Sequence, residues 1–425
     1  MHGDDPYVIG RATRGLSLDV PVTLALADHR RHLHVIGRTG TGKSTLLMSL
    51  MLADLHAGRG FALLDPHGDL AAELADSVPP ERTGDVLYLD PSDLDHPVGF
   101  NPLDRVAADR RPLVAAQLVA AFKHVFAQSW GPRLEYVLLN SLRLLLDGRQ
   151  PTLVALPRLL VDADFRDQLL TTCTDPLVRL FWTREFADLG ERFAAEVLAP
   201  VQNKVGAVLS VPALRNILGQ NRSTLDIPRI MDGRRILIAN LAKGRLGEAP
   251  AHLLGAFLVT AFAQAAEARS ASVEDDRQDF HLVVDEFQNF STESFASILS
   301  EARKWRLRLT LCHQYLGQIG EGLRQAVLAN AGSLIVFRCG TEDAQVLGPE
   351  FGFDNPQALA DTANFTAWAK LIRDGMPGDP MLLRTDTPEF PHGGRSVAVI
   401  SRTRARHTRP RALVERNIRR ALGLE

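Results

Sequence analysis

The chain has 425 residues, of which 45% are hydrophobic and 23% charged, a balance typical of a globular protein and not of a disordered one. Its formal net charge of −2 excludes a protein that binds nucleic acid through charge spread over its whole surface, so any such contact has to be local. Three cysteines without a Cys-x-x-Cys pair argue against a disulfide or zinc scaffold.

Strand and helix patterns alternate along the first part of the chain. Residues 7–30 alternate apolar and polar around glycines and predict a short β-meander. A buried strand at 32–36 then leads through a glycine-rich turn into an apolar helix at 43–55, and two further buried strands are predicted at 61–64 and 86–89. This alternation implies right-handed crossovers and a parallel sheet with helices on both faces.

The glycine-rich turn is a complete G-x-x-x-x-G-K-S motif, the P-loop signature, and it lies between a predicted strand and a predicted helix. Its glycines allow backbone N–H groups to surround a phosphate, and the helix N-terminus adds its positive dipole. Lys43 is expected to reach the β- and γ-phosphates of ATP, and the Ser44 hydroxyl to bind Mg²⁺. The predicted ATP contacts are Gly37, Arg38, Thr39, Gly40, Thr41, Gly42, Lys43, Ser44 and Thr45.

A long helical segment interrupts the strand pattern. From residue 105 to 232 apolar residues recur at helical spacing, and strands resume only later, at 235–239, 281–284, 307–311 and 333–337, with a small antiparallel addition at 365–372 and 381–384. We therefore predict an α/β fold, a RecA-like P-loop core with a mainly parallel sheet and an inserted all-helical domain. The predicted parts are residues 1–104 (β-meander and first half of the core), 105–232 (helical insertion), 233–390 (second half of the core) and 391–425 (basic tail).

Two acids end one of the resumed strands. A P-loop enzyme needs a carboxylate for the metal and a group that positions water. Asp285 and Glu286 directly follow the buried residues 281–284, at the sheet edge where α/β proteins bind ligands. We expect Asp285 to hold Mg²⁺ and Glu286 to polarise the attacking water.

The next strand ends in a polar group and is preceded by a cationic segment. Gln314, at its tip, is the candidate sensor of the γ-phosphate. The segment 301–308 contains three arginines. These either complement a helix C-terminus or supply one side chain that stabilises the transition state on a neighbouring subunit's nucleotide. Spacing alone does not choose among Arg303, Arg306 and Arg308.

Six short segments, taken in order, resemble the HerA/FtsK superfamily, and within it the type IV secretion coupling ATPases of the TraG kind and their soluble HerA-like relatives. They are residues 37–44, 64–70 (LDPHGDL), 240–247 (NLAKGRLG), 284–289 (VDEFQN), 302–309 (ARKWRLRL) and 313–315 (HQY). The resemblance covers most of the chain outside the helical insertion and the tail.

The resemblance implies a hexameric ring that hydrolyses ATP at subunit interfaces and moves DNA, single- or double-stranded and without base specificity, through a central channel. Lys43, Ser44, Asp285, Glu286 and Gln314 match family positions directly. In the coupling proteins the trans-acting arginine lies eleven residues before the glutamine, which selects Arg303. A relaxase, a nuclease or a secretion channel is the implied partner, in conjugation, repair or defence.

Two other functions stay open at this stage. One is a secretion ATPase whose helical domain grips a protein substrate, and the other is a slowly hydrolysing, nucleotide-gated scaffold. No signal peptide is predicted, and the longest apolar stretch, 253–266, is predicted to be a buried helix because it is too short for a membrane span. The expected location is the cytoplasm, with peripheral attachment to the inner membrane left open.

Three weaker signals remain. Asp65, His67 and Asp69 suggest a strand end, with Asp69 as a helix cap, rather than a metal cluster, and Asp65 is expected near the nucleotide. Lys243 and Arg245 lie in a loop that either faces the channel or is an ordinary turn. The run 401–411, rich in arginine, either contacts nucleic-acid phosphate or is a solvated or subunit-covering tail.

Overall fold

The computed structural model describes residues 5–14, 17–149, 151–188, 191–292, 295–388 and 394–424. The chain divides into two compact units. The core unit consists of residues 1–89, 227–240 and 262–403, and the helical unit of residues 90–226, 241–261 and 404–425. The helical unit thus takes in most of the segment predicted as an insertion, together with two further stretches of chain.

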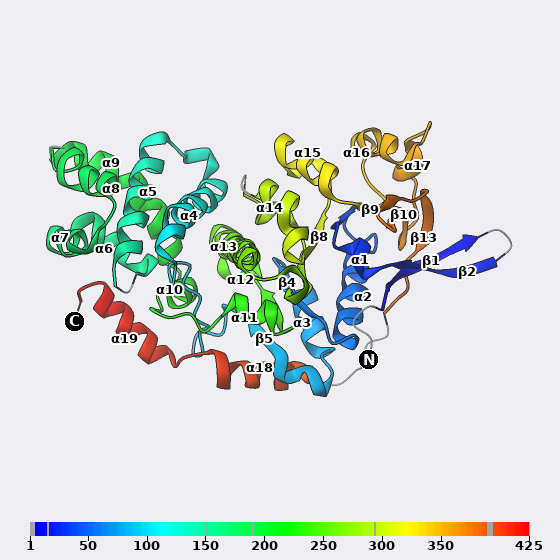
Figure 1. The fold of residues 1–425 in the computed structure, drawn as a ribbon, viewed down its shortest axis with the longest axis horizontal. Helices are drawn as coiled ribbons and strands as arrows, with labels where there is room; N and C mark the ends of the chain where they lie inside the picture. Colours follow the sequence, from blue (N-terminus) through cyan, green and yellow to red (C-terminus); the bar gives the residue numbers. More distant parts are fainter. Residues whose placement is uncertain are drawn as a thin grey trace. The chain divides into compact units, whose positions relative to one another are not determined.

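In the described part of the chain, one eleven-stranded sheet runs through the core unit in the order β2-β1-β13-β10-β9-β3-β8-β7-β4-β6-β5 (Figure 1). The strands are β1 (Tyr7–Arg14), β2 (Ser17–Leu24), β3 (Leu33–Ile36), β4 (Gly60–Asp65), β5 (Val86–Leu89), β6 (Ile236–Asn240), β7 (Phe280–Val284), β8 (Leu307–His313), β9 (Ser333–Phe337), β10 (Thr366–Lys370) and β13 (Met381–Arg384). From β9 to β5 all neighbours are parallel, while β10, β13 and the β1–β2 hairpin extend the sheet antiparallel. The predicted mainly parallel sheet is confirmed.

The central strands are buried along their whole length because both of their faces are covered, and most of their residues are apolar. Successive residues of β9 alternate between two cores: Ile335 and Phe337 pack in one, Leu334 and Val336 in the other. Helices α2 (Lys43–His56) and α3 (Asp69–Asp76) contribute to the first core, and α16 (Thr341–Leu347) to the second. The core unit also contains α1 (Leu26–His29), α11 (Ile227–Asp232), α14 (Phe295–Glu301), α15 (Glu321–Asn330) and α17 (Gln357–Ala360), and a small hairpin of β11 (Ile372–Arg373) and β12 (Met376–Pro377).

Several helices of the helical unit start with an aspartate at the N-cap or a proline in the first turn. The Asp175 side chain caps α8 by accepting from the backbone N–H groups of Leu177 and Val178, and the Asp162 side chain caps α7 by accepting from that of Phe165. Proline occupies the first turn of α5 and of α10, where its missing N–H costs no hydrogen bond. The helices are α4 (Arg111–Val125), α5 (Pro132–Asp147), α6 (Leu156–Val161), α7 (Ala163–Thr172), α8 (Pro176–Leu180), α9 (Glu191–Leu209), α10 (Pro212–Leu218), α12 (Lys243–Leu246) and α19 (Arg411–Ala421).

Two helices, α13 (Glu248–Ala268) and α18 (Arg395–His407), each contribute residues to both units. Among the described residues, one helical stretch, Glu248–Ala271, is long and apolar enough to cross a membrane, and 78% of its most apolar window is buried inside the protein. This burial agrees with the core helix predicted at 253–266. Much of the predicted basic tail is helical, as α18 and α19.

Candidate nucleotide-binding site

The P-loop connects β3 to α2 and takes a conformation that its glycines permit. Gly40 (φ 75°) and Gly42 (φ 117°) have left-handed backbones, which side-chain-bearing residues rarely adopt. The Lys43 ammonium donates to the carbonyl oxygens of Gly37 (2.6 Å) and Arg38 (3.2 Å), and the Thr41 hydroxyl donates to the Arg38 oxygen (2.7 Å). These bonds hold the loop in a closed turn at the N-terminus of α2.

A cavity of about 470 Å³ in the core unit brings most of the predicted residues together. Six of the nine P-loop residues line it, and Gly37, Arg38 and Thr41 shape the loop instead through the bonds described above. The lining residues are Thr39, Gly40, Gly42, Lys43, Ser44, Thr45, Asp65, His67, Asp69, Leu70, Glu73, Asp285, Glu286, Gln314 and Phe365. Arg303 is not among them.

The cavity's second wall is built from the ends of β7 and β8. Glu286 follows β7 in a left-handed conformation (φ 47°), a strained geometry for a glutamate that aims its side chain at its neighbours. Its Oε1 accepts from the amide nitrogen of Gln314 (2.8 Å), and its Oε2 accepts from Gln288 (2.7 Å). The backbone N–H of Gln314 donates in turn to Gln318 (3.0 Å). The glutamate and the predicted sensor are therefore directly hydrogen-bonded.

Asp285 is a buried carboxylate with other acids close to it. Burial, reinforced by the nearby charges of Glu286 and Asp65, raises its pKa from 3.8 to about 6. Three carboxylates around one buried position create negative charge that a dication would neutralise. Among the described residues no cluster of three His, Cys, Asp or Glu side chains forms a ready metal cage. Ser44 and Asp285, the two predicted Mg²⁺ ligands, both line the cavity.

Comparison with known proteins identifies the architecture. The conjugative coupling protein TrwBdeltaN70 shares 17% identity over 90% of both chains, with a TM-score of 0.65. TrwB in complex with ADP and Mg²⁺ shares 18% identity over 92% of this chain and 97% of that one, with a TM-score of 0.65. VirB4 of Thermoanaerobacter pseudethanolicus shares 13% over 90% and 96%, with a TM-score of 0.60. No curated protein matches the chain.

Residues 7–112 match the family model described as the central domain of helicase HerA. The match covers 106 of the 425 residues, among them the P-loop. The resemblance inferred from the six sequence segments is thereby confirmed. The three solved structures named above are less than 20% identical to this chain and establish the fold alone.

Three lining residues, Leu70, Glu73 and Phe365, were not predicted as site residues from the sequence. Phe365 precedes β10, and the sequence offered only an aromatic residue at the start of a strand. Its backbone N–H donates to the Thr41 carbonyl of the P-loop (2.8 Å), a contact between residues 324 positions apart that no local pattern reports. A positive φ of 58° was equally invisible in the sequence.

The expected cap of α3 was wrong. Gly68, not Asp69, is its N-cap, because Asp69 already lies in the helix. Asp65, which ends β4, instead bonds to the start of α3. Its two carboxylate oxygens accept from the backbone N–H groups of His67 and Ala71, each at 2.9 Å. Asp65 nevertheless lines the cavity beside Asp285, and His67, Asp69 and Glu73 form the same wall.

The three arginines left open by spacing have different environments. Arg308 is fully buried and paired with Asp54 at 2.9 Å. Arg306 lies 3.8 Å from Asp279 and is half-buried. Arg303 is exposed in the short 3-10 turn Ala302–Trp305. Of the three, Arg303 is the side chain best placed to reach another molecule.

The weaker cationic candidates are partly engaged within the helical unit. Arg404 pairs with Asp93 at 2.7 Å, and Arg411 pairs with Glu415 at 2.7 Å. Arg245 is exposed and donates to Ser92 at 3.1 Å. Two arginines of the run at 401–411 thus have acidic partners within the helical unit.

Proposed function

We propose that this chain binds ATP with Mg²⁺ in the cavity and hydrolyses it. The P-loop amides and Lys43 would hold the phosphates, and Ser44 and Asp285 the metal. Mg²⁺, when bound, supplies charge that stabilises the leaving phosphates. Glu286 would orient and polarise the attacking water. The relatives support this: solved structures of TrwB contain the ATP analogue ADPNP, the GTP analogue GDPNP, and ADP with Mg²⁺.

The observation that carries the proposal is the hydrogen bond between Glu286 and Gln314 at the mouth of the P-loop. It joins the water-positioning acid to the residue that would sense the γ-phosphate. When the γ-phosphate is present, the Gln314 side-chain amide could donate to it instead of to Glu286. Binding or loss of that phosphate would therefore alter the orientation of Glu286. Such a link between nucleotide state and side-chain geometry is a requirement of a motor ATPase.

The unit of action would be a homohexameric ring in the cytoplasm or at the inner membrane surface, which moves DNA without base specificity. TrwB is described as a bacterial conjugative coupling protein, and this supports a transfer task of the type IV secretion kind. Arg303 would reach the neighbouring subunit's nucleotide, because it is exposed while Arg308 is committed to Asp54. The ring's partner would be a relaxase, a nuclease or a secretion channel.

A DNA-stimulated ATPase assay tests the motor. Single- and double-stranded DNA of unrelated sequences should each raise phosphate release, and Glu286→Gln should abolish both basal and stimulated rates. Stimulation by a protein partner alone would favour a protein-secretion ATPase. Slow turnover that neither DNA nor protein stimulates, with ATP-dependent assembly, would favour a scaffold.

Mixing inactive subunits tests the shared site. Arg303→Ala subunits keep their own P-loop, and Lys43→Ala subunits keep their arginine. If catalysis is shared between neighbours, a mixture should recover part of the activity that each variant alone lacks. Arg306→Ala is the matched control, since it lies on the same segment and should remain active. An arginine acting within its own subunit predicts no recovery.

A further inference from the structure

The strand order places Phe365 on the opposite side of the P-loop from the two acids. At the carboxyl edge of the sheet, the end of β3 carries the P-loop, and the ends of β8 and β7 on one side carry Gln314 and Glu286. On the other side lie the end of β9 and the beginning of β10, because β10 runs antiparallel to β9 with Ala367 opposite Phe337. Phe365 therefore flanks the P-loop on its other side and lines the same cavity.

The backbone of Phe365 is strained and held in place. A φ of 58° is an outlier for an aromatic residue and persists only where neighbours enforce it. The Phe365 N–H donates to the Thr41 carbonyl of the P-loop (2.8 Å), and its carbonyl accepts from the backbone N–H (2.8 Å) and the hydroxyl (3.1 Å) of Thr385. These bonds tie the position of the ring to the P-loop itself.

The ring is not used for core packing. Phe365 is 48% exposed, whereas Phe337 on the neighbouring strand is fully buried. An ideal Cβ placed on Gly42 would approach the Phe365 ring to 3.2 Å, so ring and loop are adjacent. A large apolar surface, fixed beside a phosphate loop and open to a cavity, is suited to a flat apolar ligand group.

We propose that Phe365 stacks on the nucleobase of the bound nucleotide, an inference that rests on the proposed ATP site. The γ-phosphate has to lie near Glu286, and the β-phosphate within the P-loop. The nucleoside end of an extended nucleotide then emerges on the side away from the acids, where Phe365 lies. Stacking uses the face of the base, which every base possesses, so the contact would contribute affinity without selecting adenine over guanine.

Isothermal titration with two ligands separates this contact from the phosphate site. ADP carries a base, and inorganic tripolyphosphate does not. Phe365→Ala should weaken ADP binding about tenfold, the range for loss of one base–aromatic stack being roughly 5- to 150-fold. Tripolyphosphate affinity should be unchanged, and GDP affinity should fall by a factor similar to that for ADP. Phe365→Tyr should keep most of the ADP affinity.

Two further variants separate base stacking from a loss of folding or of general apolar packing. Phe365→Leu retains apolar bulk without an aromatic face, and should weaken ADP alone even if the alanine variant fails to fold. Leu382→Ala, 46% exposed on β13 of the same sheet, is the matched control and should bind both ligands normally. Equal loss of ADP and tripolyphosphate in Phe365→Leu would show that the ring merely supports the loop, and unchanged ADP affinity would also overturn the stacking. If the unaltered protein bound neither ligand, the nucleotide site itself would be wrong.

Discussion

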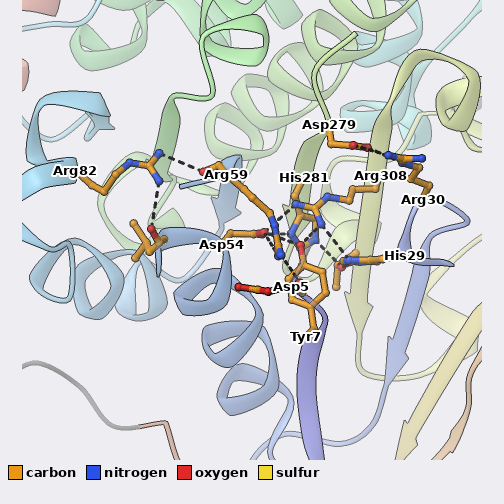
Figure 2. Close-up of polar contacts among 12 residues, drawn as sticks. Asp5, Tyr7, His29, Arg30, Asp54, Arg59, Arg82, Asp279, His281 and Arg308 are labelled. Carbon is orange, nitrogen blue, oxygen red and sulfur yellow. Dashed lines mark hydrogen bonds and ion pairs between the residues drawn. The ribbon is translucent and has the colours of Figure 1, made fainter. Parts of the chain in front are cut away.

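Strands β7 and β8 have a polar cluster at each end. One cluster lines a cavity, and the other is buried and internally paired. At the carboxyl ends lie Asp285, Glu286 and Gln314, which line a cavity. Near the amino ends, His281 and Arg308 are register partners on adjacent strands, and both are fully buried. Figure 2 shows them converging with Tyr7 on Asp54, which comes from the helix that follows the P-loop.

The amino-end cluster is extensively paired. Asp54 accepts from the Tyr7 hydroxyl (2.6 Å) and from Arg308 (2.9 Å), and its second oxygen lies 2.7 Å from a ring nitrogen of His281. Arg59 adds an ion pair at 3.4 Å. Burial lowers the pKa of Arg308 to about 9, so the guanidinium is still charged at neutral pH, and the Asp54 carboxylate balances this buried charge.

The carboxyl-end cluster concentrates charge of one sign. Asp65, Asp285 and Glu286 lie together at one wall, and the raised pKa of Asp285 reflects it. The cluster at the amino ends of these two strands is therefore internally paired, whereas the cluster at their carboxyl ends faces a cavity, where we propose that a cation and phosphates bind. Perturbed charges of this second kind are typical of functional sites. The difference predicts that changes at the two ends have separable effects.

The largest effect is expected for Glu286→Gln. The shape and one acceptor remain, but the carboxylate that would polarise water is lost, so ATP turnover should fall about 10²- to 10⁴-fold. The melting temperature should stay within a few degrees, because the side chain belongs to the open cluster. Phosphate release and thermal denaturation of the same preparation measure both. A strongly lowered melting temperature with normal turnover per folded molecule would reverse the assignment of the two ends.

Asp54→Ala should show the opposite pattern. It leaves Arg308 buried without a counter-charge, and removing one member of a buried ion pair costs about 3–5 kcal/mol. The urea midpoint should fall accordingly. Asp276→Ala, on an exposed loop of the same unit, is the control and should change stability by less than about 0.5 kcal/mol. An Asp54 variant as stable as the control would show that the cluster is not a determinant of cohesion.

The contrast also explains what the sequence could reveal. Asp285 and Glu286 were predictable because a P-loop demands such acids and because the end of a buried strand delivers them to its edge. Asp54 was not, since it lies on an apolar helix face and its partners are Tyr7, His281 and Arg308, up to 254 positions away. Local patterns report period and turn chemistry, whereas a buried charge network is defined only by tertiary pairing.

The same limit applies to Phe365 and to the arginines. Strand positions in the core unit were predicted to within a few residues, because parallel strands read as continuous apolar runs. The left-handed backbone of Phe365 and its bond to Thr41 depend on the order in which those strands pair. Likewise, Arg308 became distinguishable from Arg303 only once burial was known.

Gln314→Ala should have a smaller effect on activity. A hydrogen bond to a charged group contributes about 1.5–3 kcal/mol, so loss of the bond to Glu286 should lower kcat roughly 10- to 100-fold with little change in KM. Gln318→Ala is an informative second variant, because its side chain holds the Gln314 backbone and should lower kcat less. A Gln314 variant with raised KM and normal kcat would instead indicate a role in nucleotide binding.

The smallest effect for a single residue is expected from the buried histidines, which make the stability of the folded protein depend on pH. Burial lowers the pKa of His32 and His34 from 6.5 to about 4, and holds those of His29 and His313 well below 6.5. The pair His34–His313 shows why. His313 Nδ1 can only donate to the Tyr315 carbonyl (3.1 Å), so its Nε2 accepts from His34 at 2.7 Å, and both rings are neutral.

Because the folded pKa values lie below the unfolded one, the unfolded chain binds more protons as pH falls below 6.5. Stability should therefore decline between pH 6.5 and 4, by roughly 1 kcal/mol per pH unit for each such histidine. Urea unfolding at pH 7.5, 6.0 and 5.0 measures the slope. His34→Gln, which can still donate to His313, should reduce the slope by about one proton while the activity contrast between Glu286 and Asp54 persists. A stability that is flat over this range would mean that these rings already carry charge in the folded protein, and that the buried network tolerates it.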